Sequence, residues 1–516
     1  MADLQTAPAT AGADAIVVHT TFLNIITIVV AGMGSFLFGY ANNAIAGTLA
    51  QNSFLVKFLT GSNANSIIGG ILGGFLGGGL IGAVISAPIS QRFGRRAATA
   101  TAAALITFSA AILAGSVNIG MFLAGRVICG IGAGIVITNC PVYMSEIAPP
   151  HIRGMLVGNH AISIVYAYIL SSVIALGFHY VDAPYQWRLQ YVMLAFFGLL
   201  LGVSLVFLPE SPRWLCEKER YEEAWNILQR LHQSKNDPSA QLARAEMAQM
   251  HAQIAEERSL PSDYLHIFRT PHLRHRMICS ILVWVMGQST GILVIANLTP
   301  TLFGQLGFGT VLQLGLSIVW TTCALLGCFV NAAIMDRFGR VKLLAAGGYL
   351  CSIALILEAV LQKYYLGSDN KSGVNAAVAM YFLFIIFYGS TIDCAAYVYI
   401  SEIWPTHLRS KGTTIGLVSF FSCAIAYTSP ASQAFSQIGW KYYFVMISVC
   451  LVSSTAILFI LPETARLTLE EIAEKFGDKV VVHFGDEFEG EVKNTEGFSK
   501  QFVSQQEQVV AEEGKE

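Results

Sequence analysis

Long apolar stretches recur along the chain at the length that a membrane-crossing helix needs. A helix that spans a bilayer core requires about 20 mostly apolar residues, and twelve stretches meet this requirement. Their approximate limits are 22–44, 64–89, 97–115, 120–143, 155–176, 189–208, 277–297, 309–334, 341–361, 376–400, 412–432 and 440–461. They lack the two-residue alternation of membrane β-barrel strands, and an open sheet edge cannot face lipid. The pattern predicts an all-α polytopic membrane protein with twelve transmembrane helices in a lipid bilayer.

Charged residues lie mostly outside these stretches. Residues 209–275 hold 19 of the 64 charged side chains and residues 462–516 hold 20, which leaves 25 for the other 394 residues. This distribution predicts a cytoplasmic N-terminus (1–21), a first six-helix bundle (22–208), a cytoplasmic linker with short helices (209–276), a second six-helix bundle (277–461) and an acidic cytoplasmic tail (462–516). Within the linker, an amphipathic helix is predicted over residues 216–233.

The loops between the predicted spans are alternately rich and poor in Lys and Arg. One set of loops holds nine of these residues and the other set five, and the richer set is expected to be cytoplasmic. This orientation places both termini and the linker inside. It places the Asn370-Lys371-Ser372 sequon outside, so Asn370 is a predicted glycosylation site. The other sequon, at Asn297, falls at the end of a span, and we expect it to be unmodified.

Composition argues against several classes of function. The formal net charge of −2 gives no basic surface for nucleic acid. The ten cysteines show no metal-ligand spacing, and nine of them lie in apolar stretches, which is typical of packing residues. We find no nucleophile elbow and no phosphate-binding loop. The sequence therefore predicts a protein that is not an enzyme, with no catalytic residues, no metal and no cofactor.

Three short motifs occur twice, at matching loops of the two predicted bundles. The pairs are Phe93-Gly94-Arg95-Arg96 with Phe338-Gly339-Arg340, Ser145-Glu146-Ile147 with Ser401-Glu402-Ile403, and Pro209-Glu210-Ser211 with Pro462-Glu463-Thr464. The chain is therefore predicted to be two six-helix repeats. Two repeats that rock against each other around a site near the bilayer midplane are typical of an alternating-access transporter.

Further motifs lie in the same order along the chain. They are Arg126 followed by Gly130, Gly132 and Gly134 in the fourth span, Pro212-Arg213 after the sixth, and Thr468-Leu469-Glu470-Glu471-Ile472 after the twelfth. Taken together, the motifs resemble those of the sugar porter family of the major facilitator superfamily, and the sequence resembles its fungal members. The resemblance implies the major facilitator fold and a secondary active or facilitative transporter, a symporter or uniporter, for a small-molecule substrate. It also implies a monomer in the plasma membrane, with protons as a candidate co-substrate.

The resemblance also implies a conformational latch at the cytoplasmic ends of the two halves. In this family, acidic and basic residues there are understood to join the halves in the outward-open state and to separate in the inward-open state. Surface charge that only sets the topology is the alternative. The family's acidic residue before the first Arg-x-Gly-Arg is Gln91 here, so we expect an asymmetric latch. The matching residues are Arg95, Glu146, Arg153, Asp336, Arg340, Glu402 and Arg409.

Proton coupling has an unusual set of candidate residues. Proton-coupled members of the family carry an Asp after the Gly-Tyr of the first span, facing the fourth-span Arg, but here that position is Ala41 while Arg126 is retained. We expect Asn42 and Asn43 to hydrogen-bond Arg126 without titrating, as in facilitative members.

Two other ionisable residues within spans, His160 and Asp393, could take over proton coupling. For each of them, a structural hydrogen-bonded role is the alternative. Arg126, Asp393 and His160 are therefore the candidate coupling residues.

The positions that would contact a sugar depart most from the family. Of its seventh-span glutamine pair only Gln288 remains, and its eleventh-span Asn-Trp is Phe420-Phe421 here. The expected cavity lining is Asn42, His160, Gln288, Asn297 and Tyr397, each with a structural interhelical hydrogen bond as the alternative. A sugar or related polyhydroxy compound is the favoured substrate. The apolar character of the site leaves open a carrier or exporter of an organic acid or specialised metabolite, and a nutrient-sensing transceptor is a third alternative.

Overall fold

The structure is a computed structural model of the chain. It describes residues 22–147, 153–232, 243–244, 247–248, 250–251, 254, 260–261, 263–368, 370–465, 467 and 469–477. These residues form helices and connecting turns, with no strand among them. The predicted N-terminal segment (1–21) and most of the predicted tail (478–516) lie outside the described residues.

The N-terminal half contains six long helices and one short one. The long helices are α1 (Phe22–Ala50), α3 (Ala64–Phe93), α4 (Arg95–Gly115), α5 (Ile119–Ile147), α6 (Arg153–His179) and α7 (Gln186–Ser204). The short helix α2 (Asn52–Phe58) follows α1. Their lengths of 19 to 30 residues suffice to cross a hydrocarbon core about 30 Å thick.

The C-terminal half repeats this plan, but two of its membrane passes are interrupted. Its seventh pass consists of α12 (Pro271–Ser289) and α13 (Ile292–Gln305), and its tenth of α16 (Lys371–Tyr388), the π-helical η2 (Gly389–Asp393) and α17 (Cys394–Ile403). The other four passes are α14 (Thr310–Phe338), α15 (Arg340–Tyr365), α18 (Arg409–Ile438) and α19 (Tyr442–Ile460).

The seventh pass breaks where the sequence predicts one continuous span. Gly291 has a φ of 78°, in the left-handed region that favours glycine, and it forms the N-cap of α13. Thr290 forms the C-cap of α12. Hydropathy alone did not reveal this break because both pieces are apolar.

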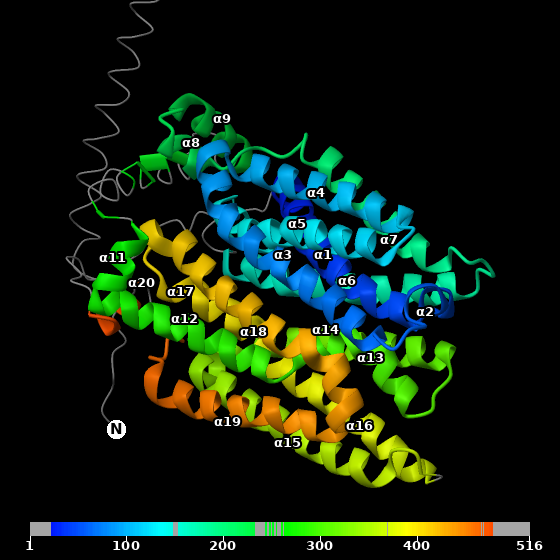
Figure 1. Cartoon of the computed structure of the whole chain (residues 1–516). Helices are drawn as coiled ribbons and strands as arrows, with labels where there is room; N and C mark the ends of the chain where they lie inside the picture. The colour runs from blue at the N-terminus through cyan, green and yellow to red at the C-terminus, as the bar shows by residue number, and fades with distance from the viewer. Residues whose placement is uncertain are drawn as a thin grey trace, which may run out of the picture.

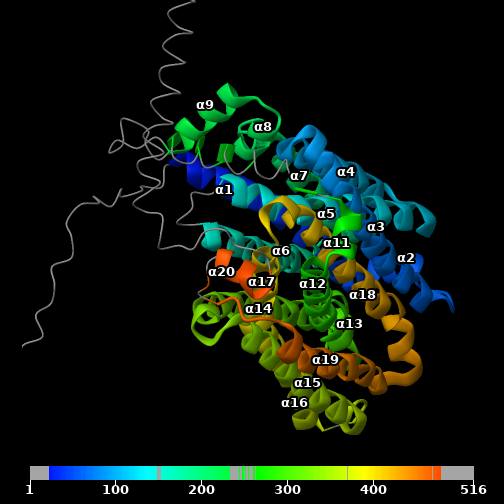
Figure 2. The same ribbon diagram turned by 90° about the vertical axis from the view of Figure 1, so that its left-hand side faces the viewer.

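The helices lie roughly side by side as two groups. In Figure 1 the helices of the N-terminal half form one group and those of the C-terminal half form the other, with α3 and α18 at the boundary. Figure 2 shows the same division from the end that carries α8, α9 and α20. We call this end, which is predicted to be cytoplasmic, the inner end, and the end that carries α2 the outer end.

Ten stretches of the described chain are long and apolar enough to cross a membrane. One of them, 409–460, joins the separate passes α18 and α19, and α1 supplies one more pass. The helical passes therefore number twelve, as the hydropathy pattern predicts.

Glycines allow the closest helix contact in the N-terminal half. A Cβ atom at Gly78 or Gly82 of α3 would collide with backbone oxygens of α5, and one at Gly130 or Gly134 of α5 would collide with those of α3. Small residues at a helix interface let the two backbones approach each other. Across the halves, Gly69 of α3 packs in the same way against the Ser429 carbonyl of α18.

The linker contains α8 (Pro212–Glu217), α9 (Tyr221–His232) and α11 (Tyr264–Arg269), and α20 (Leu469–Lys475) follows the last pass. The prediction of a single helix over 216–233 is wrong at its beginning. Glu219, with a φ of 64°, separates α8 from α9, and α9 begins at Tyr221. Cys216 is buried between these helices, and burial, followed by the nearby Glu217 charge, raises the pKa of its thiol to about 11. Its thiol is thus protonated at neutral pH, as suits a packing residue.

Candidate functional site

Arg126 of α5 is buried in the middle of the N-terminal half. Its guanidinium donates to the Ala41 carbonyl oxygen of α1 at 3.0 Å and lies over the Phe75 ring at 4.3 Å from the ring centre. The expected hydrogen bonds between Arg126 and the side chains of Asn42 and Asn43 are not formed among the described residues, and the amide nitrogens of both asparagines donate to Tyr168 of α6. A backbone carbonyl and an aromatic face, which are neutral partners, therefore surround the cation.

Polar side chains join α1 to α6 along the inside of the N-terminal half. Asn42 Nδ2 donates to the Tyr168 hydroxyl at 2.7 Å, and Asn43 Nδ2 donates to the Tyr168 carbonyl and to Ser172 Oγ at 3.0 and 3.1 Å. Ser35 Oγ and His160 Nδ1 form a hydrogen bond of 2.6 Å. These contacts fix the orientation of the His160 ring.

Four aromatic rings connect the halves at the level of these contacts. His160 meets Tyr397 of α17 edge to face at 5.1 Å between ring centres, and Tyr397 meets Trp284 of α12 in the same way at 4.9 Å. Trp284 continues the series to Phe420 of α18 at 5.0 Å. Two predicted lining residues, His160 and Tyr397, are therefore neighbours, and Trp284 is an additional member that the sequence did not single out.

Four buried polar atoms, one on α6 and three on α12 and α13, have no hydrogen-bond partner among the described residues. They are His160 Nε2, Trp284 Nε1, Gln288 Nε2 and Asn297 Oδ1. Each of these side chains is at most 3% exposed. Buried polar groups of natural proteins are nearly always hydrogen-bonded, and leaving one unbonded costs about 1–3 kcal/mol. Water or a polar solute that enters this region can bond to such atoms.

Gln288 and Asn297 lie on either side of the break between α12 and α13. Gln288 is in the last turn of α12, and Asn297 of α13 donates to the Leu293 carbonyl of its own helix at 2.9 Å. Asn42, another predicted lining residue, also has its amide nitrogen bonded, to the Tyr168 hydroxyl. The break places the two amides on separate helical segments.

Asp393 ends the π-helical turn of the tenth pass. Its Oδ2 accepts a hydrogen bond from Cys328 Sγ of α14 at 3.2 Å, and no cation pairs with it in the described part of the chain. π-helical turns are frequent at functional sites. The sequence identified Asp393 but not the π-helical turn, because no residue pattern distinguishes such a turn from the α-helix around it.

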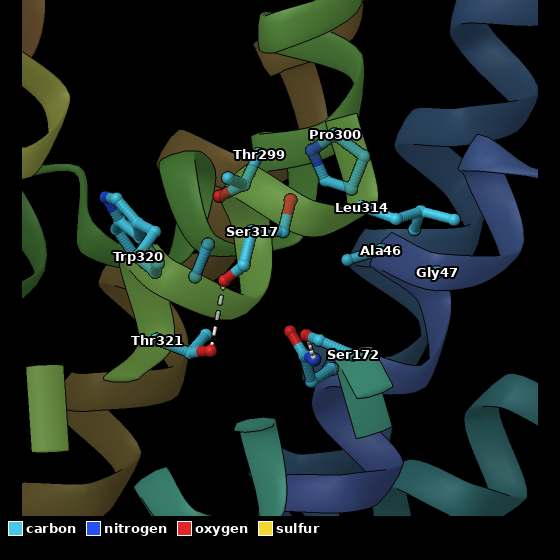
Figure 3. A pocket seen from close by; sticks show the side chains of 11 residues that line it. Ala46, Gly47, Ser172, Thr299, Pro300, Leu314, Ser317, Trp320 and Thr321 are labelled. Carbon is cyan, nitrogen blue, oxygen red and sulfur yellow. Dashed lines mark hydrogen bonds between the residues drawn. The ribbon is translucent and has the colours of Figure 1, made fainter. Parts of the chain in front are cut away.

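A small pocket lies between the halves, nearer the outer end. Its volume is about 10 Å³, and polar and apolar residues both line it, namely Asn43, Ala46, Gly47, Ser172, Ala296, Thr299, Pro300, Leu314, Ser317, Trp320 and Thr321. Figure 3 shows the residues of α1 and α6 on one side and those of α13 and α14 on the other. We call it the outer pocket.

Hydrogen bonds close the outer end of the bundle between α3 and α18. Asn65 donates from Nδ2 to Ser436 Oγ at 3.0 Å and accepts from Ser432 Oγ at 2.9 Å. Ser429 Oγ donates to the Gly69 carbonyl at 3.2 Å. We call these five residues the outer seam. No sequence pattern marks it, because its partners are 360 or more residues apart.

The predicted latch residues form ion pairs at the inner end, each within one half. Arg95 Nε and Nη2 each donate to a Glu146 oxygen at 2.8 Å, and Arg340 Nη2 donates to Glu402 at 2.8 Å and Asp336 at 3.2 Å. The side chain of Arg153, which begins α6, lies outside the described residues, and Arg409 begins α18.

Two acidic residues hold the helices that carry these arginines. Glu210 accepts hydrogen bonds from the backbone N–H groups of Arg95 and Arg96 at the start of α4, and Glu463 accepts from those of Arg340 and Val341 at the start of α15. A carboxylate at a helix N-terminus is stabilised by the helix dipole. The repeated Pro-Glu motifs thus orient the repeated arginines.

Asn370 caps α16 at the outer end and is exposed. Its Oδ1 accepts from the backbone N–H groups of Ser372 and Gly373 at 3.1 and 3.2 Å. The predicted glycosylation site is therefore a surface position of defined geometry.

These features together define a transporter class. Twelve helices in two repeats, with a polar and aromatic site between them and separate contacts at the two ends, are the architecture of an alternating-access carrier of the major facilitator type. The solved structure of the proton:xylose symporter XylE of E. coli, bound to 6-bromo-6-deoxy-D-glucose, matches the fold with a TM-score of 0.75, at 23% identity over 89% of this chain and 100% of that one.

The family model described as "Sugar (and other) transporter" matches residues 27–476. The chain belongs to this family. It is similar to the MFS-type transporter criB of Aspergillus cristatus, at 31% identity over 90% of this chain and 96% of that protein. It is also similar to the high-affinity glucose transporter of Kluyveromyces lactis, at 28% identity over 75% of this chain and 73% of that protein. The predictions of the family, of the fold and of a multi-pass membrane transporter rather than an enzyme are confirmed.

Proposed function

We propose that this protein moves a sugar or a related polyhydroxy compound across the plasma membrane by alternating access. The observation that supports this most is the set of four unbonded polar atoms, contributed by His160 in one half and by Trp284, Gln288 and Asn297 in the other, of which His160 and Trp284 belong to the aromatic series. A polyhydroxy ring offers hydroxyls for these atoms and C–H faces for the aromatic rings. The name of the glucose transporter relative agrees with this substrate class.

We propose that the two ends open alternately around this site. The outer seam holds the outer end closed in the structure, while the ion pairs Arg95–Glu146 and Arg340–Glu402 lie within their halves. When the inner end closes, the latch residues, including Arg153 and Arg409, exchange partners across the halves. A few kcal/mol of differential contact energy suffices to shift such an equilibrium.

For proton coupling we propose Asp393 as the titrating residue and Arg126 as a fixed cation. Asp393 is partly buried, has no cation partner in the described chain and ends a π-helical turn. His160 is the second coupling candidate, because one of its ring nitrogens is unbonded. We further propose that a single chain suffices for transport, because the site lies between the two halves of one chain.

Ligand-induced stabilisation tests the proposed substrate class. A ligand that binds only the folded state raises the unfolding temperature with concentration. We expect glucose, xylose or myo-inositol to raise the unfolding temperature of the detergent-purified protein, and Gln288→Ala and His160→Ala to lose that shift. Gln433→Ala, at an exposed glutamine on α18, should keep it. A shift with organic acids or aromatic compounds instead of all three would favour the alternative of an organic-acid or specialised-metabolite carrier.

A further inference from the structure

The C-terminal half contains a fully buried carboxyl group that the proposed transport steps do not use. Glu358 lies on α15, seven residues before the helix ends at Tyr365, and its side chain is 0% exposed. Its Oε1 accepts a hydrogen bond from Gln362 Nε2 at 2.9 Å. Its Oε2 has no partner among the described residues. The predicted ninth span contains this glutamate, although it is not among the candidate residues named from the sequence.

The polar neighbours of Glu358 are all uncharged. Gln362 Nε2 also lies 2.9 Å from the Tyr381 hydroxyl and 3.3 Å from the Tyr443 hydroxyl, and these two hydroxyls share a hydrogen bond of 2.6 Å. Tyr381 of α16 and Tyr443 of α19 are the titratable groups that face the carboxyl. In the described chain no Lys, Arg or His pairs with it.

The other packed elements bring no charged partner to Glu358 in the described chain, and Asp393 of η2, which also packs on α15, accepts from Cys328 instead. α14 faces this network with Trp320 and α13 with Phe303, while Phe435 of α18 covers the Tyr443 ring at 5.2 Å. The nearest outer-end lysines, Lys363 and Lys441, lie over the Trp440 ring at 5.5 and 6.0 Å from its centre. An unpaired carboxylate inside a bilayer is much less favourable than a protonated one. The closed arrangement therefore favours the carboxylic acid.

Trp320 connects this network to the outer pocket. It lines the pocket (Figure 3) and donates from Nε1 to the Tyr381 carbonyl at 3.1 Å. Phe303 packs on the Tyr381 ring at 5.8 Å between centres. Opening of the outer end must separate α1 and α6 from α13 and α14, because these four helices line the pocket. This separation would expose Trp320, which contacts the Tyr381 partner of Gln362, to water.

We propose that Glu358 is a proton-binding site that holds its proton while the outer seam is closed and releases it to the external solution when the outer end opens. The O–H bond of the acid breaks, the proton passes to water in the opened pocket, and the electron pair stays on the carboxylate. Protonation thereby stabilises the outer-closed state. This inference goes beyond the proposed substrate and holds whichever solute is carried.

Infrared spectroscopy of the purified, substrate-free protein tests the protonation state. We expect a carbonyl band of a buried carboxylic acid at neutral pH that disappears in Glu358→Gln. It should persist in Tyr443→Phe, which removes one hydroxyl of the same network and keeps the acid. If the carboxylic-acid carbonyl region of the spectrum is the same in Glu358→Gln as in the unaltered protein, Glu358 is ionised and the proposal is overturned. If Glu358→Gln does not fold, Glu358→Met replaces the acid by an apolar side chain of similar size, with the same criterion.

Thiol labelling in cells tests the link to the outer end. A cysteine placed by Ser317→Cys in the outer pocket is labelled by a membrane-impermeant reagent only when the outer end opens. At each pH, the labelling rate is measured with Glu358 intact and with Glu358→Gln, and the first rate is divided by the second. In this ratio the pH dependence of the thiol itself cancels. We expect this ratio to rise about fivefold or more between external pH of about 5 and about 8. A ratio that stays constant would contradict the proposal, and neither assay requires that a sugar be transported.

Discussion

Asn65 on α3 and Ser432 on α18 are 367 residues apart in the sequence and form a hydrogen bond of 2.9 Å across the boundary between the halves. The same amide donates to Ser436, one helical turn further along α18. One side chain thus joins α3 to two points on the facing helix, at the end where the outer pocket would open.

Removing this amide should weaken the closure of the outer end. In Asn65→Ala both hydrogen bonds are lost, and each is worth about 1 kcal/mol, so the outer-open population should rise about fivefold or more. The measurement is the rate at which Ser317→Cys is labelled from outside, with Asn65 intact and with Asn65→Ala added. Ser422→Ala is the matched control, because this exposed serine of α18 bonds only to the Val418 carbonyl of its own helix. Equal labelling rates in all three proteins would remove Asn65 from the account of the outer end.

The inner ion pairs should affect the rate of transport more than the amount of protein in the membrane. Glu146→Gln breaks a paired contact whose two side chains are only 7% and 9% exposed, and it removes a latch partner. We expect slower initial uptake at unchanged surface level, and the same for Glu402→Gln and Arg409→Ala.

The control for the latch variants is a salt bridge of the linker that contains no latch residue. Glu223→Gln breaks the Arg220–Glu223 pair of the linker, whose side chains are 49% and 54% exposed, and exposed pairs contribute little. Its transport rate should match that of the unaltered protein. Unchanged rates in the three latch variants would show that these charges only set the topology.

The aromatic and amide site should determine affinity for the solute. Gln288→Ala removes a donor that would otherwise meet a solute hydroxyl, so kcat/KM should fall about fivefold to a hundredfold for the transported compound. Tyr397→Phe should have a smaller effect, since the ring contacts with His160 and Trp284 are retained. Concentration-dependent uptake measures both variants. A Gln288→Ala protein with unaltered KM and kcat would place the solute elsewhere.

Coupling to protons should depend on Asp393 if uptake is proton-driven. Asp393→Asn keeps the size of the side chain and an oxygen that can accept from Cys328, but it cannot titrate. We expect uptake against a gradient to lose its sensitivity to a protonophore, while exchange of labelled for unlabelled solute continues. His160→Ala is measured in parallel. Uptake that stays protonophore-sensitive in both variants would exclude the two residues as coupling sites.

Glycosylation tests the predicted orientation. Asn370→Gln and Ser372→Ala should each abolish a glycosidase-sensitive shift in gel mobility when the protein is made in a eukaryotic host. Ser372→Ala retains the Asn370 side chain that caps α16, whereas Asn370→Gln also loses the cap, at a cost of about 0.5–2 kcal/mol. A shift abolished by neither variant would leave the orientation unsupported.

The sequence predicted the helical passes well because each pass is a local property of about 20 residues. It also identified Arg95, Glu146, Arg340 and Glu402, because repeated motifs mark them in both halves. Contacts between distant segments were beyond its reach.

Hydropathy could not show that Asn42 bonds to Tyr168, that α12 ends before Gly291, or that the Gln362 partner of Glu358 meets hydroxyls from two other passes. Each of these depends on which faces of the helices come together. A single glutamate in an apolar span is nevertheless a signal that can be read from the sequence, because such residues are rarely without a role.

Uptake of labelled solute is the most direct test of the central claim, that this chain carries a sugar or polyol by alternating access. The measurement uses yeast without hexose carriers of its own, with labelled glucose, galactose, xylose, lactose and myo-inositol. We predict saturable uptake of at least one of them, with loss of affinity in Gln288→Ala. Absence of uptake for all five, with the protein verified at the cell surface, would contradict the proposed substrate class.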